Sequence, residues 1–109
     1  MSQWIPVCNV DDVETEDVIP VKHEGNDIAI FRSPDDQYYA TAGHCSHERQ
    51  LLCDGLVMDG VIECPKHNGR IDYRTGKALS APIIDNIAVY PTRVENDTVY
   101  IDFENATIP

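Results

Sequence analysis

Two short motifs, each a cysteine followed closely by a histidine, place the strongest constraint on how this chain can fold. One residue separates Cys45 from His47, two residues separate Cys64 from His67, and 16 residues lie between the motifs. Proteins use thiolates and imidazoles as ligands for zinc and for iron–sulfur clusters. The pattern therefore predicts one metal centre for which the fold brings two separate loops together.

Two kinds of metal centre are compatible with two thiolates and two imidazoles. One is a closed tetrahedral zinc site. The other is a two-iron cluster in which both thiolates bind one iron and both imidazoles bind the other. Zinc fingers usually pair Cys with Cys and His with His within a local motif, whereas each motif here holds one of each. The mixed pairs favour the cluster, because each loop can then supply a ligand to both irons.

Turn-forming residues recur every eight to twelve positions, and the segments between them have strand character. Strands are expected over 28–32, 38–42, 61–64, 70–73, 88–94 and 98–103, with an earlier one around Cys8. The last of these alternates, with positions 99, 101 and 103 on a core face and 100 and 102 on a wetter face. The segment 11–18 has too few apolar residues for more than a turn. The whole chain, 1–109, is expected to be a single all-β domain, a sandwich or small barrel, with the Cys/His pairs on loops.

The composition narrows the class of partner. Nineteen acidic residues face eight basic ones, for a net charge of −11. Such a surface repels nucleic acid and anionic lipid and attracts basic protein patches, although acidity can also serve solubility alone. No apolar run is long enough to span a membrane, and the N-terminus lacks the features of a secretory signal. A cytoplasmic location is therefore expected, with the cysteines as thiols or metal ligands.

With Pro65 after its second cysteine, the Cys-x-His and Cys-x-x-His pattern resembles the Rieske [2Fe–2S] motif. Over nearly its whole length the chain resembles the small Rieske ferredoxins of bacterial ring-hydroxylating dioxygenases. The resemblance implies an antiparallel Rieske fold with a cluster-binding subdomain made of two loops, and one [2Fe–2S] cluster per chain. It implies that Cys45 and Cys64 ligate one iron and that His47 and His67 ligate the other.

The same resemblance implies a function in electron transport. The chain would be a soluble, monomeric one-electron carrier in aromatic hydrocarbon catabolism and not itself an enzyme. It would pass electrons from a flavoprotein NAD(P)H reductase to a terminal oxygenase, docking transiently through its acidic surface. Two alternatives stay open: a Rieske-type small subunit of another redox enzyme, such as assimilatory nitrite reductase, and a zinc-stabilised interaction domain.

The remaining cysteines and histidines receive minor roles. Cys8 and Cys53 are expected to be buried thiols without a metal. His23 is expected at the surface, and His44 either contacts the first ligand loop or is solvated. A catalytic oxygenase would need a further iron held by two histidines and a carboxylate, with only these two histidines left to supply it.

Overall fold

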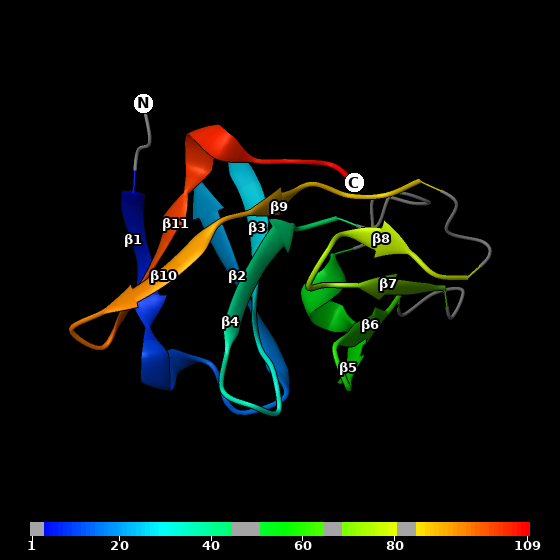
Figure 1. Cartoon of the computed structure of the whole chain (residues 1–109), viewed down its shortest axis with the longest axis horizontal. Helices are drawn as coiled ribbons and strands as arrows, with labels where there is room; N and C mark the ends of the chain where they lie inside the picture. The colour runs from blue at the N-terminus through cyan, green and yellow to red at the C-terminus, as the bar shows by residue number, and fades with distance from the viewer. Residues whose placement is uncertain (1–3, 45–50, 65–68, 81–84) are drawn as a thin grey trace.

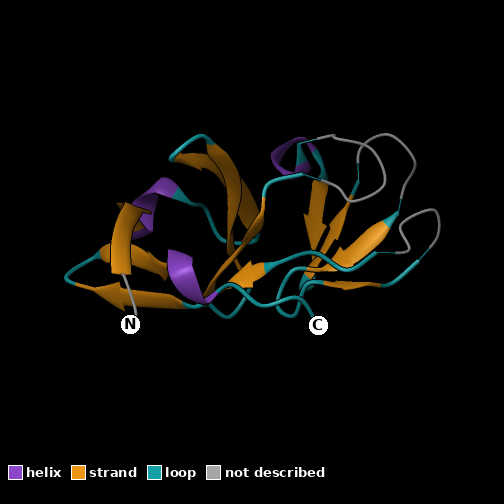
Figure 2. Cartoon of the chain, turned by 90° about the horizontal axis from the view of Figure 1, so that it is seen from above, coloured by secondary structure: helices purple, strands orange, loops and turns teal. Residues whose placement is uncertain are grey.

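The chain folds into three antiparallel sheets. The computed structural model describes residues 4–44, 51–64, 69–80 and 85–109. Within these ranges the only helical elements are short 3-10 turns, drawn purple in Figure 2: η1 (Val10–Asp12), η2 (Leu52–Asp54) and η3 (Phe103–Asn105). No helix in the described ranges is long and apolar enough to cross a membrane.

The sheets follow one another across the molecule in Figure 1. The first has the order β1-β11-β10 and consists of β1 (Trp4–Asn9), β11 (Thr98–Asp102) and β10 (Thr92–Glu95). The second has the order β2-β3-β4-β9 and consists of β2 (Asp17–His23), β3 (Asn26–Arg32), β4 (Tyr38–Ala42) and β9 (Val89–Tyr90). The third has the order β5-β6-β7-β8 and consists of β5 (Leu56–Met58), β6 (Val61–Glu63), β7 (Arg70–Asp72) and β8 (Lys77–Ala78).

Strand β3 explains how the three sheets are held together. Its residues Ile28, Ala29, Ile30 and Phe31 are all buried, although successive side chains of a strand point to opposite faces. Ile28 and Ile30 pack in one apolar cluster with residues of the first sheet, and Ala29 and Phe31 pack in another with residues of the third. A strand buried on both faces has a continuous apolar run instead of an alternating one.

The all-β antiparallel fold is confirmed, and the strands expected over 28–32 and 38–42 pair as the hairpin β3–β4, with Phe31 opposite Tyr39. The strands expected over 61–64 and 70–73 form the pair β6–β7, with Ile62 opposite Ile71, and β10 pairs with β11, with Val94 opposite Val99. Val99 and Ile101 face the core as the alternation predicts.

Three expectations about the strands were wrong. The segment 88–94 forms two strands, because Pro91 interrupts it and the chain passes from β9 in the second sheet to β10 in the first. Strands β2, β5 and β8 were missed. Strand β2 contains Pro20, which is tolerated because β2 lies at a sheet edge.

The third error concerns Asp102, which is buried and not on a wetter face. Its carboxylate accepts a hydrogen bond of 2.7 Å from the Asn105 side-chain amide, and its backbone N–H donates to the Pro91 carbonyl. These partners replace water for a polar residue in the interior.

Tyr73 lies at the centre of the cluster between the second and third sheets. Its ring stacks parallel to Phe31, with centroids 4.4 Å apart, and is tilted against Tyr39 at 5.7 Å. Burial raises the pKa of this phenol. Among the described residues its hydroxyl is the only buried side-chain N or O atom without a hydrogen-bond partner. A buried polar group without a partner costs about 1–3 kcal/mol.

We therefore expect Tyr73→Phe to leave the free energy of unfolding unchanged or to raise it by up to about 1 kcal/mol. Tyr38→Phe is the matched control, because the Tyr38 hydroxyl donates a 2.9 Å hydrogen bond to the Val10 carbonyl. Its loss should cost about 1 kcal/mol. Urea midpoints followed by circular dichroism under anaerobic conditions measure both effects. A Tyr73→Phe variant less stable than Tyr38→Phe would contradict the reading of this hydroxyl.

Candidate metal centre

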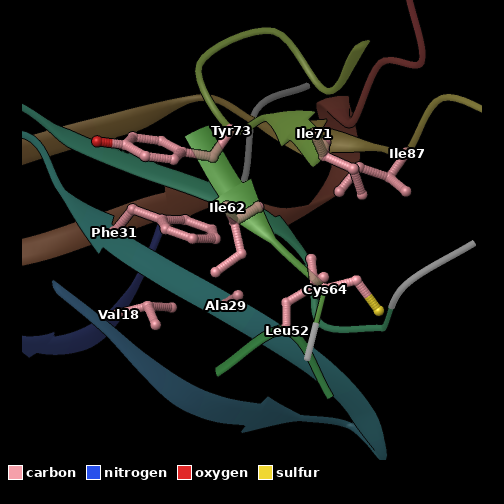
Figure 3. Packing of buried hydrophobic residues seen from close by; sticks show 9 residues of the cluster. All are labelled: Val18, Ala29, Phe31, Leu52, Ile62, Cys64, Ile71, Tyr73 and Ile87. Atoms are coloured by element: carbon pink, nitrogen blue, oxygen red, sulfur yellow. The ribbon is translucent and has the colours of Figure 1, made fainter. Parts of the chain in front are cut away.

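Cys64 is the predicted ligand that lies within the described residues, and it sits at the edge of a buried apolar cluster. It follows β6 directly, is 1% exposed, and belongs to the same cluster as Leu52, Ile62 and Ile71. In Figure 3 its sulfur lies at the end of the cluster remote from Tyr73.

The second ligand loop is closed at its base by the backbone of Cys64. The Cys64 N–H donates a 2.7 Å hydrogen bond to the carbonyl of Gly69, on the other side of residues 65–68. The loop that carries His67 therefore leaves and re-enters the sheet at one point, between β6 and β7. Such a base fixes where a short loop presents its ligands.

The first ligand loop has an equally fixed base. His44 and Leu51, which flank residues 45–50, pair as an isolated antiparallel bridge, and the Leu52 N–H donates to the Gly43 carbonyl at 2.8 Å. Gly43 in turn donates to the Asp27 carbonyl in β3. A Cβ at position 43 would lie 2.7 Å from the backbone carbon of Asp27, so only glycine allows this close approach.

The bases of the two loops meet through Leu52. This side chain is fully buried and packs in the apolar cluster that contains Cys64 (Figure 3). Leu52, which directly follows the base of the first loop, is thus packed beside Cys64, which begins the second loop. The described bases of the two ligand loops therefore lie beside each other, while the ligand set itself stays a prediction.

A third segment is anchored beside the same place. The Arg70 N–H donates to the Ser80 hydroxyl at 3.1 Å, and the Leu79 N–H donates to the Arg70 carbonyl at 2.8 Å. On the far side of residues 81–84, the Asn86 side-chain oxygen accepts a 2.9 Å bond from the Ala78 N–H. Arg70, the first residue of β7, is therefore hydrogen-bonded to Ser80, which directly precedes residues 81–84.

The predicted ligands Cys45, His47 and His67 lie outside the described residues. Within the described ranges no three His, Cys, Asp or Glu side chains form a group that could hold a metal ion. The described donor nevertheless fits a [2Fe–2S] cluster: a buried cysteine, at the hinge of one loop, packed against the hinge of the other.

The other two cysteines have raised pKa values. Burial and the nearby Asp12 carboxylate raise the pKa of Cys8 to about 11, and burial followed by the Asp54 charge raises the pKa of Cys53. Both side chains are partly buried, whereas the sequence predicted buried thiols.

The two histidines outside the motifs both have partners. The His44 Nε2 lies 3.4 Å from an Asp27 carboxylate oxygen, so it is tied to β3 instead of being simply solvated. The His23 ring packs edge-on against Phe103, with centroids 4.7 Å apart, so His23 is not a plain surface residue. Sequence reasoning also missed Leu52 as a support of the site, because leucine is not a ligand type.

Comparison with known proteins gives this arrangement a family. The model of the Rieske [2Fe–2S] domain matches residues 3–91. The ferredoxin component of the naphthalene 1,2-dioxygenase system of Pseudomonas putida is 40% identical over 100 residues, which cover 92% of this chain and 95% of that protein.

Solved structures agree with that match. A ferredoxin of Sphingomonas yanoikuyae B1 superposes with a TM-score of 0.86 at 31% identity, covering 92% of this chain and 98% of that one. A chain from the complex of reduced oxygenase and oxidized ferredoxin in carbazole 1,9a-dioxygenase has a TM-score of 0.85 at 30% identity, covering 94% of each. Proteins described as nitrite reductase small subunits match at 19% and 20% identity, which shows likeness of fold alone. The chain therefore belongs to the Rieske [2Fe–2S] domain family, and within it is a ferredoxin that carries electrons and is not itself an enzyme.

Proposed function

We propose that Cys45 and Cys64 hold one iron of a single [2Fe–2S] cluster and that His47 and His67 hold the other. The observation that carries this proposal is the position of Cys64, buried at the hinge of one loop and packed with Leu52 at the hinge of the other. Each loop then contributes one thiolate and one imidazole, so that the cluster is held between the two loops.

The bound cluster accepts one electron and releases it again. Two thiolates and two neutral imidazoles contribute less negative charge than four thiolates, which makes reduction easier than in a four-cysteine ferredoxin. The chain's own part is to keep these ligands in place and to exclude water from the sulfur side. Burial of Cys64 among Leu52, Ile62 and Ile71 serves the second purpose.

We infer that the whole chain, as one cytoplasmic and monomeric domain, carries electrons from a flavoprotein NAD(P)H reductase to a terminal oxygenase. Identity of 40% to a dioxygenase ferredoxin supports this role over that of a nitrite reductase subunit, for which the likeness is one of fold. The net charge of −11 supports attraction of basic partner surfaces from a distance. A zinc-stabilised interaction domain is the remaining alternative from another class.

Serine substitutions test the ligand set. Cys45→Ser and Cys64→Ser should each lose most of the iron and acid-labile sulfide, since each removes a thiolate ligand. Cys53→Ser is the matched control and should keep two irons and two sulfides per chain, because Cys53 lies outside the proposed ligand set. Metal analysis and the EPR signal after dithionite reduction measure the result. A colourless protein that contains zinc would refute the electron-carrier proposal.

The packing beneath the site offers a second test. Leu52→Ala should lower the free energy of unfolding by about 2–5 kcal/mol and reduce iron content, because Leu52 is fully buried beside Cys64. Leu56→Ala is the control with the same chemical change, at a side chain that is 58% exposed. It should keep full iron content. Equal iron content in both variants would show that this packing does not support the centre.

Salt dependence tests the role of the acidic surface. The second-order rate constant for transfer from the reduced chain to an oxygenase should fall about tenfold or more as NaCl rises from about 10 to 150 mM, since screening shortens long-range attraction. Stopped-flow spectroscopy measures it. The double variant Glu14→Gln, Glu104→Gln removes two exposed charges that make no described contact and should give a shallower slope. A rate constant that does not change with salt would overturn the attraction by charge.

A further inference from the structure

The sheet that supports the centre has a second face, which points away from the apolar cluster. Its inward side chains are Val57, Ile62, Ile71 and Ala78. Because neighbours along a strand alternate and directly paired residues share a face, the remaining positions lie on the other side. We call the following eight residues the outer sheet face: Leu56, Met58, Val61, Glu63, Arg70, Asp72, Lys77 and Leu79.

The outer sheet face is apolar along its β5 edge. Leu56 is 58% and Met58 42% exposed, and Val61 of β6 is paired with Met58. The exposed Leu79 lies at the opposite edge of the sheet. Five of the eight residues, all but Asp72, Lys77 and Leu79, line a shallow hollow of about 200 Å³ together with Asp59. Apolar side chains gathered around a hollow, with Met among them, are typical of protein docking surfaces.

The face is also electrically unlike the rest of the chain. Residues 45–80 contain five acidic and five basic residues, whereas the other residues contain 14 acidic and three basic ones. The entire net charge of −11 therefore lies outside the segment that builds this sheet and its loops. On the face itself Glu63 is paired directly with Arg70, so that a negative and a positive side chain lie side by side on neighbouring strands.

The outer sheet face borders the proposed ligand loop. Glu63 directly precedes Cys64, and Arg70 directly follows Gly69, the residue whose carbonyl closes the base of that loop. A protein bound to this face would therefore lie beside the base of the loop that contains the proposed ligand His67.

We propose that the outer sheet face is the contact surface for the terminal oxygenase, whose own contact patch is apolar with basic residues at its rim. This inference rests on the proposed function. The apolar side chains of Leu56, Met58 and Val61 supply the short-range contact, while acidic residues beside them, such as Asp59 and Glu16, meet the basic rim. The Glu16 carboxylate accepts a 3.0 Å hydrogen bond from the Asp59 N–H, which places both at the edge of the hollow.

Other occupants fit less well. A second copy of this chain would bring another charge of −11 close to the first, which opposes self-association. Anionic membrane is repelled by the same charge. A solved relative is a ferredoxin in complex with a dioxygenase's oxygenase, which favours an oxygenase as the occupant.

Paired truncations of exposed apolar residues test the proposal. The variant Leu56→Ala, Met58→Ala removes the two exposed apolar side chains that β5 contributes to the outer sheet face. The variant Val94→Ala, Ile108→Ala is the matched control, because those side chains are 48% and 67% exposed and lie on other elements. Each holoprotein is reduced with dithionite, so that no reductase takes part. Its oxidation is then followed by stopped flow against increasing concentrations of a terminal oxygenase that the wild-type chain reduces.

The face variant should raise the oxygenase concentration at half-maximal rate about tenfold, and the control should change it less than twofold. The difference should persist in 1 M NaCl, where the Debye length is about 3 Å and charge attraction is screened. Iron content and EPR signal should match wild type in both variants. Indistinguishable behaviour of the two variants would overturn the contact surface while leaving the carrier function intact. If the wild-type chain reduced no terminal oxygenase, the proposed function would fail as well.

Discussion

The burial of strand β3 on both faces is the interaction on which the rest of the structure depends. Ile28 and Ile30 join it to the first sheet, and Ala29 and Phe31 join it to the third. Without strand β3, the third sheet, whose four strands are two or three residues long, would have little to pack against. Burying a side chain of the size of Ile or Phe contributes about 1.5–3 kcal/mol, so β3 alone accounts for a large part of the cohesion between layers.

The position of the candidate centre also depends on strand β3. Asp27, at the start of β3, accepts the backbone bond from Gly43 and lies beside His44, so the entry to the first ligand loop is positioned by the same strand. The entry to the second loop is positioned by β6, whose inward side chain Ile62 packs in the cluster with Phe31. The entries to two loops that are far apart in sequence therefore both depend on packing and hydrogen bonds with strand β3.

Much of this could be predicted from the sequence, and the reasons are local. The ligand types and their spacing identified the motif, and turn residues such as Asn96-Asp97 located a hairpin. What the sequence did not reveal depends on tertiary partners. Asp102 reads as a solvent-facing residue until Asn105 is folded back onto it, and β2 reads as broken at Pro20 until its edge position is known. Leu52 is one leucine among several until its packing beside Cys64 is seen.

The hydrogen-bonded bases of the two ligand loops affect how the molecule responds to the gain or loss of an electron. The Cys64–Gly69 bond and the His44–Leu51 bridge involve backbone atoms, so they persist whatever side chains the loops carry. Bases that are fixed in this way limit the movement of atoms that must accompany gain or loss of an electron. A scaffold with little to rearrange keeps the reorganisation energy small, which suits a molecule that has to complete its exchange during one brief encounter.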